Sequence, residues 1–147
     1  MDIQQVNRED GEAIRVAFKN VDGGGSITTG FGVAVVTSVA SFNGNNVVKS
    51  TAALGKTFWG VSQKDVPING FGKATVSGYA ASIAISNVGT SITVTAGDVL
   101  IYGAVAGTFF SSITDQALTT QFYRYIVNGT TQTVSALAWV SGFVKGI

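Results

Sequence analysis

Short runs in which apolar and polar residues alternate, each closed by glycine or asparagine, recur along this chain of 147 residues. Residues 13–19 place Ile14 and Phe18 on one face and Arg15 on the other, which is typical of a β-strand with one solvated side. Such short strands, with a turn about every ten residues, predict an all-β fold. Further extended runs are expected at 30–42, 57–62, 73–86, 91–95 and 99–105.

The expected architecture is a compact antiparallel β-sandwich or barrel, jelly-roll or tulip-like, because no alternation of strands and helices is visible. At most a short helix is expected near 112–121, where Thr114 or Asp115 provides an N-cap. Asn128-Gly129 between two strand-like runs predicts a tight hairpin of 122–127 with 130–140.

One β domain is expected over 13–147, because single domains commonly have about this length. The polar segment 1–12 is expected to be a flexible arm that orders only on a partner. It shows no apolar core of a signal peptide. Internal echoes are weak: Gly30-Phe31-Gly32 against Gly70-Phe71-Gly72, and SITTG against SITVT. They do not establish a duplication.

Charged residues make up only 12% of the chain and hydrophobic residues 46%. Much of the surface must therefore consist of Ser, Thr, Asn and Gly or be covered by a partner, and the apolar surplus favours a partner. The mean hydropathy is +0.36, but no apolar run approaches the ~20 residues of a spanning helix. Lysine and arginine are scattered along the chain. No clustered basic stripe is visible, which argues against nucleic-acid binding.

The residue types that most enzymes need are missing. The chain has no cysteine and no histidine, which removes thiolate chemistry, the usual general base and the commonest metal ligand. Asp65, Asp98 and Asp115 stand in turns, where aspartate is expected to accept hydrogen bonds from its own backbone. Gly55-Lys56-Thr57 lacks the first glycine of a phosphate-binding loop. The sequence therefore predicts no catalysis, no metal and no cofactor.

The aromatic side chains are expected in the core or in contacts between subunits. Tyr123 and Tyr125 alternate with Phe122, Arg124 and Ile126, so both faces of that strand are bulky. A strand covered on both faces in so small a protein favours a subunit interface.

A family resemblance is carried by three stretches, VAFKNVDGGGSITTGFGVAVV, TFWGVSQKDVPINGFGKATVSGYAASI and SITVTAGDVLIYG, within residues 13–105, a span of roughly two-thirds of the chain. They resemble the small capsid decoration proteins of tailed bacteriophages, also called head auxiliary or cement proteins. Residues 106–147 match less clearly.

The resemblance implies a structural virion protein, made in the host cytoplasm, that binds the capsid exterior as a symmetric oligomer, typically a trimer, and stabilises the shell. Its partners would be the major capsid protein and its own copies, with no membrane involved. On this reading, capsid contacts are expected at Val6, Arg8, Lys64, Asp65 and Phe71, and oligomer contacts at Phe122, Tyr123, Tyr125 and Trp139.

Three alternatives stay open: a β-structured phage tail or fibre module that binds glycans, a structural subunit of the tail tube or connector, and an enzyme. Exposed aromatics grouped with Asn, Asp or Gln on one surface would favour the glycan-binding module.

Overall fold

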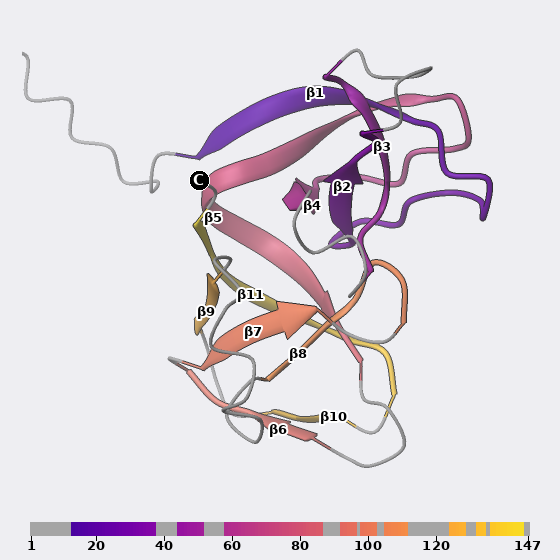
Figure 1. Ribbon diagram of the computed structural model, residues 1–147. Helices are drawn as coiled ribbons and strands as arrows, with labels where there is room; N and C mark the ends of the chain where they lie inside the picture. Colours follow the sequence, from indigo (N-terminus) through magenta and orange to yellow (C-terminus); the bar gives the residue numbers. More distant parts are fainter. Residues whose placement is uncertain are drawn as a thin grey trace, which may run out of the picture.

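The described part of the chain is all-β. The computed structural model describes residues 13–37, 44–51, 58–86, 92–96, 98–102, 105–111, 124–128, 132–134 and 136–145, and these contain strands but no helix (Figure 1). The strands are β1 (Ile14–Asn20), β2 (Gly32–Val35), β3 (Asn46–Lys49), β4 (Phe58–Ser62), β5 (Phe71–Ile85), β6 (Ile92–Val94), β7 (Val99–Tyr102), β8 (Phe109–Ser111), β9 (Arg124–Asn128), β10 (Gln132–Val134) and β11 (Ala138–Lys145). The expectation of an all-β barrel fold is confirmed.

The first half of the chain closes into a small barrel. Its strands follow the order β1-β3-β2-β4-β5, and a pairing of β5 with β1 closes the ring. All neighbours in this ring are antiparallel except β1 and β3. A closed ring leaves no unpaired strand edge.

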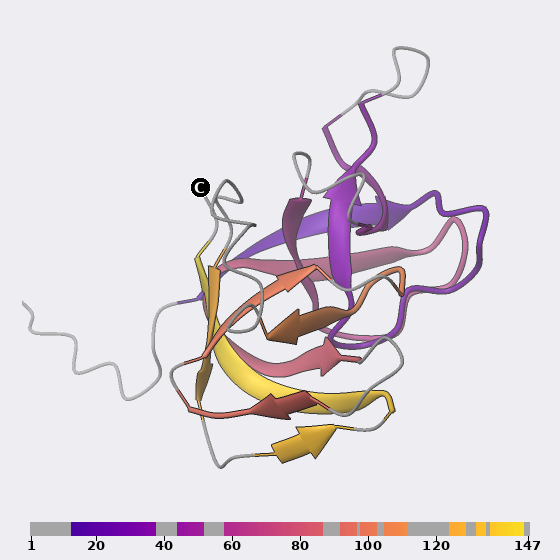
Figure 2. The ribbon, with the colours of Figure 1, turned by 60° about the horizontal axis from the view of Figure 1, so that its bottom comes forward.

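The second half closes into another barrel, which comes forward in Figure 2. Its order is β5-β11-β9-β7-β8, closed by a pairing of β5 with β8. Again one pair, β5 and β8, is parallel and the others are antiparallel. The long strand β5 therefore ends the first barrel and begins the second.

The two barrels share their connectivity and also their register. Asn20 lies opposite Val47 in the parallel pair of the first barrel, and Ile85 lies opposite Phe109 in that of the second. The remaining equivalent pairs are Phe18–Gly72 with Ile83–Val140, Lys19–Phe71 with Ala84–Trp139, Val33–Lys49 with Leu100–Ser111, Gly32–Val61 with Val99–Ile126, and Val61–Thr75 with Ile126–Phe143.

The agreement extends outside the rings. Ile27 forms an isolated bridge with Val66 beside the first barrel. Ile92 pairs with Val134 in the two-stranded sheet of β6 and β10 beside the second. These are equivalent pairs, because Ile27 and Ile92 each lie between the first and second strands of their barrel. The chain is thus a structural repeat with one strand held in common.

The shared strand bends where it passes from one barrel to the other (Figure 1). Residues 71–77 pair with β1, and residues 77–85 pair with β11. Gly78, with φ of 99°, lies at this junction, and glycine reaches such angles without the Cβ clash of other residues.

Simple alternation would place Tyr79, Ala81, Ile83 and Ile85 on one face of β5, and the structure follows this only in part. Ile83 and Ile85 are buried, but Ala81 is exposed and Ala80 is buried. The register against β11 shifts between Val140 and Gly142, and such a bulge reverses which residues face the core.

Each barrel has its own apolar core. In the first, Phe18, Ile27, Val33, Val47, Val66 and Ala74 pack together. The second is built from Ile83, Ile85, Val94, Leu100, Val140 and Val144, and it also receives Val61 and Ala80.

The barrels meet at the loop between β7 and β8. Gly107 donates its N–H to the Ser50 carbonyl at 2.7 Å and accepts a hydrogen bond from the Gly32 N–H at 2.9 Å. A second link runs from the Ala84 N–H to the Gly30 carbonyl at 2.9 Å. The halves are joined by hydrogen bonds as well as by β5.

The tight hairpin expected at Asn128-Gly129 is wrong. β9 pairs with β11, with Asn128 opposite Ser141, whereas residues 132–134 leave to pair with β6. The helix expected near 112–121 and the arm at 1–12 lie outside the described residues.

Candidate functional site

A buried asparagine fixes the loop between β4 and β5. Asn20 donates from Nδ2 to the Val66 carbonyl at 3.0 Å and to the Gly25 carbonyl at 3.2 Å, and its Oδ1 accepts from the Asp22 N–H at 2.9 Å. Backbone bonds from Asn20 to Gly70 and from Asn69 to Asn20 add to this. The loop is therefore held firmly enough to present side chains in one arrangement.

Asp65 holds the other side of this loop. Its Oδ1 accepts hydrogen bonds from the Thr29 N–H at 2.7 Å and the Thr29 hydroxyl at 2.9 Å. The backbone bond and then the hydroxyl bond lower the pKa of Asp65 below its usual value, although the carboxylate is exposed. Asp65 was expected to accept hydrogen bonds from its own turn, and this is wrong, because it accepts them from Thr29, 36 residues earlier. Asp98 does accept a hydrogen bond within its own turn, from the Thr95 N–H.

The outward side of β1 and of the first half of β5 carries a group of cations. Because side chains alternate along a strand, Arg15, Ala17 and Lys19 share this side of β1, opposite Lys73 and Phe71 of β5. With Gln63 and Lys64 from the adjoining loop, these residues form what we call the cationic face. Its four cations are Arg15, Lys19, Lys64 and Lys73.

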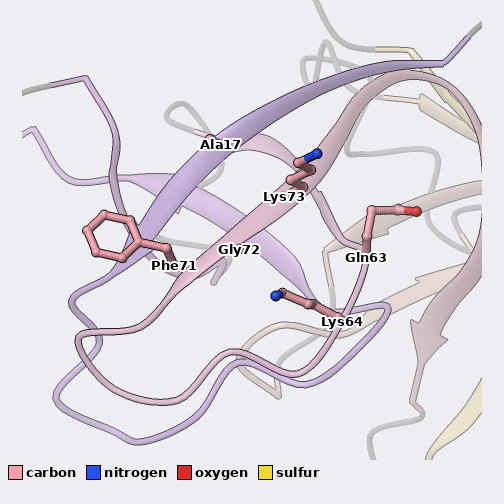
Figure 3. Close-up of a pocket in the computed structure, with 6 residues that line it drawn as sticks. All are labelled: Ala17, Gln63, Lys64, Phe71, Gly72 and Lys73. Atoms are coloured by element: carbon pink, nitrogen blue, oxygen red, sulfur yellow. The ribbon is translucent and has the colours of Figure 1, made fainter.

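A groove of about 480 Å³ lies on the cationic face, lined by Ala17, Gln63, Lys64, Phe71, Gly72 and Lys73 (Figure 3). In that view Phe71 projects at one end and Gln63 at the other, with both lysines between them. Phe71 is 72% exposed and the nearby Ile68 is 50% exposed. Cationic and apolar groups thus surround one hollow.

The corresponding surface of the second barrel has no such charge. The register places Trp139 where the first barrel has Phe71, and Ser141 where it has Lys73. Counting back from the equivalent pair Val66 and Val134, Lys64 corresponds to Gln132. The residues equivalent to Lys64, Lys73 and Phe71 are therefore uncharged, and the groove's lysines are not a property of the shared architecture.

A second exposed surface runs along β11. Leu137, Trp139 and Phe143 alternate with buried residues and are 43%, 45% and 45% exposed. Tyr79 of β5 meets Phe143 edge to face, with ring centroids 5.7 Å apart. We call these four residues the aromatic stripe.

Trp139 also connects the barrels. Its Nε1 donates to the Thr29 carbonyl at 3.2 Å, and the position that a Cβ would occupy at Gly30 lies 3.1 Å from its Cδ1. One edge of the indole is thus engaged within the chain, and the rest remains exposed.

The structure brings together only some of the residues expected at contacts. Lys64 and Phe71 line one groove, and Asp65 is adjacent but points to Thr29. Trp139 lies on the aromatic stripe, while Tyr125 lies in β9, paired on both sides with Val144 and Leu100. Val6, Arg8, Phe122 and Tyr123 lie outside the described residues.

Sequence reasoning placed Arg15 and Lys19 on the solvated face of one strand, but it did not join them to Lys73 in one surface, because Lys73 is far away in the chain. It also did not place Leu137 and Phe143 on one surface with Trp139, although each is an even number of positions from Trp139 and such residues share one face of a strand.

Among the described residues, no group of three acidic, histidine or cysteine side chains is placed to hold a metal ion. Nor does that part of the chain contain a helix long and apolar enough to cross a membrane. Comparison of the sequence with known protein families and with curated proteins identified no match.

Proposed function

We propose that this chain is a structural virion protein that binds the outer surface of a tailed-phage capsid as a symmetric oligomer, a trimer, and stabilises the shell. The observation that carries the proposal is the presence of two separate exposed surfaces, the cationic face and the aromatic stripe, on one small protein. Exposed apolar surface of this kind usually marks a contact site.

The aromatic stripe suits contact between copies. Its members are large and apolar, and aromatic residues are enriched in the centres of protein interfaces, where charge is depleted. It lies on β11 and the second half of β5, whereas the cationic face lies on β1, the first half of β5 and the adjoining loop.

The cationic face suits contact with a different protein. It carries fixed positive charge around a groove, and complementary charge on a partner gives specificity and fast association. A trimer would present this face in triplicate, so modest contacts at each copy would add up to tight attachment.

The proposal is tested by mixing the purified protein with capsids that lack it, pelleting the shells and heating them. We expect co-sedimentation and a higher temperature of shell disruption. Failure to co-sediment, or binding that leaves the heat stability of the shell unchanged, would contradict the proposal.

The oligomer is tested separately by sedimentation velocity. Phe143→Lys places a charge in the aromatic stripe at an exposed position, so the fold is expected to survive and the trimer to dissociate. Thr37→Lys, exposed on the first barrel, is the matched control and should stay trimeric. A wild-type monomer, or a trimeric Phe143→Lys variant, would count against this use of the stripe.

A second candidate is a glycan-binding module of a phage tail or fibre, because Phe71 and Gln63 line the same groove. An aromatic ring beside an amide is a common way to hold a sugar. Binding to a glycan array that is lost in Phe71→Ala would favour this candidate over shell attachment.

A further inference from the structure

The cationic face has a chemistry that points to a particular ligand. Lys64 and Lys73 line the groove together with the exposed Phe71, and Arg15 and Lys19 lie on the same side of the neighbouring strand β1. The acidic side chains described nearby are engaged elsewhere: Asp65 accepts from Thr29, and Asp22 accepts from the Gly24 and Lys49 N–H groups. Asp65 keeps its negative charge beside Lys64, but the four cations Arg15, Lys19, Lys64 and Lys73 leave this face with a net positive charge.

We infer that the groove on the cationic face binds an acidic, extended segment of the shell subunit, one that carries Asp or Glu beside an apolar side chain. This rests on the proposed function and specifies the partner at that surface. Carboxylates would meet Lys64 and Lys73 across Gly72, and the apolar side chain would lie against Phe71 (Figure 3).

A polypeptide explains the mixture of groups better than a nucleic acid does. Nucleic-acid backbones require a continuous track of phosphate contacts, and single strands also require several rings on which successive bases stack, whereas this groove is lined by two lysines and one ring. The exposed Phe71 in that wall would gain from a ligand that brings apolar surface together with its charge.

Comparison of the barrels supports the same inference. The equivalent positions in the second barrel are Ser141, Gln132 and Trp139, and Trp139 there is engaged with Thr29 of the first barrel. Where one edge of the ring is engaged within the chain, the residues equivalent to the lysines carry no charge. Where the ring is left exposed, those positions carry lysines.

The experiment measures the binding of the full chain to capsids that lack it, with Lys64→Gln/Lys73→Gln set against wild type. We expect the affinity to fall by roughly tenfold or more, since each copy of a multivalent assembly loses its contact. Binding by wild type should weaken as salt is raised, and the salt dependence should be smaller for the variant. The charge-conserving variant Lys64→Arg/Lys73→Arg should bind nearly as wild type does.

A control separates local charge from net charge. Thr37→Glu/Thr133→Glu changes the net charge by the same amount as the double glutamine variant, at exposed positions outside the cationic face. It should bind shells as wild type does. Carbodiimide treatment of the wild-type complex should join Lys64 or Lys73 to shell aspartate or glutamate side chains, identified by mass spectrometry.

Wild-type binding with no loss in the double glutamine variant would overturn this inference and leave the proposed function standing. If wild type itself fails to bind shells, both fall. Loss of self-association in the variant would assign the face to a second copy of the chain. Binding of wild type to duplex DNA, lost in the variant, would assign it to nucleic acid, and either result would also overturn the inference.

Discussion

The two barrels solve the same packing problem with different side chains. At equivalent positions the first barrel pairs Phe18 with Gly72, and the second pairs Ile83 with Val140. In the first barrel a large side chain lies opposite a glycine, which has no side chain. In the second barrel two side chains of medium size lie opposite each other and fill a similar space. The ring and its register are thus compatible with more than one division of core volume.

The outer faces differ more than the cores do. The first barrel presents lysines and an exposed phenylalanine, while the second presents an uncharged aromatic stripe. A shared framework with different surfaces allows one small chain to bind two kinds of partner. Substitutions at equivalent positions of the two barrels test this comparison.

The largest effect is expected where the barrels touch. Gly107→Ala forces a Cβ to 2.4 Å from the Phe31 ring, at a φ of 83°. Positive φ and overpacking together should lower the free energy of unfolding by about 2–4 kcal/mol, measured by urea denaturation. Gly44→Ala is the control: its φ is 76° but nothing lies within 4 Å, so only about 1–2 kcal/mol is expected. Equal losses would mean that the contact between barrels adds nothing.

A medium loss of stability is expected when Gly72 of the first barrel is replaced by valine, the residue at the equivalent position, Val140, of the second. A Cβ at Gly72 would lie 2.4 Å from Val66 Cγ2 and 3.0 Å from Phe18 Cζ. Gly72→Val should therefore cost about 1–3 kcal/mol of unfolding free energy.

The companion change sharpens the comparison. Phe18→Ile makes the pair resemble Ile83–Val140, so Phe18→Ile/Gly72→Val should be more stable than the sum of the single losses predicts. Simple additivity in a double-mutant cycle would show that the two cores are not interchangeable at this position.

The smallest effect concerns Asp65, which has no counterpart in the second barrel, where Thr133 occupies the equivalent position. Because Thr29 lowers the pKa of Asp65 in the folded state, its contribution to stability is present above the usual value of 3.8 and is lost as pH falls. Asp65→Asn should melt slightly below wild type at neutral pH, and the difference should close in acid. A constant difference across pH would rule out this linkage.

Much of the fold could be predicted from local pattern. Alternation located β1, β4, β5, β6 and β7, because one-sided burial leaves its mark on every second residue. The Asn128-Gly129 hairpin failed because turn chemistry favours a reversal locally but does not decide which strand a segment pairs with. Here residues 132–134 pair with β6, which is distant in sequence.

The repeat shows the same limit. Of the two echoes noted in the sequence, Ile27-Thr28 and Ile92-Thr93 do occupy equivalent places. The Gly-Phe-Gly echo does not, because one copy precedes β2 and the other begins β5. In the equivalent pairs Phe18–Gly72 and Ile83–Val140 the residue types differ at both positions. The correspondence is therefore visible in the strand register and not in the sequence.

The candidate site was predictable in part for the same reason. Lys64 and Phe71 stand close together in a loop that local pattern marks as exposed, and both line the groove. Lys73, Lys19 and Arg15 join them only because β1 lies beside β5, a long-range pairing that no local signal encodes.

The strand that the barrels share has a mechanical consequence. Most paired modules are joined by a linker that can swing, but here a single backbone, β5, forms a wall of each barrel. Tension applied between the cationic face and the aromatic stripe would be carried by covalent bonds along β5. Such a coupling transmits load between two neighbours without a hinge to absorb it.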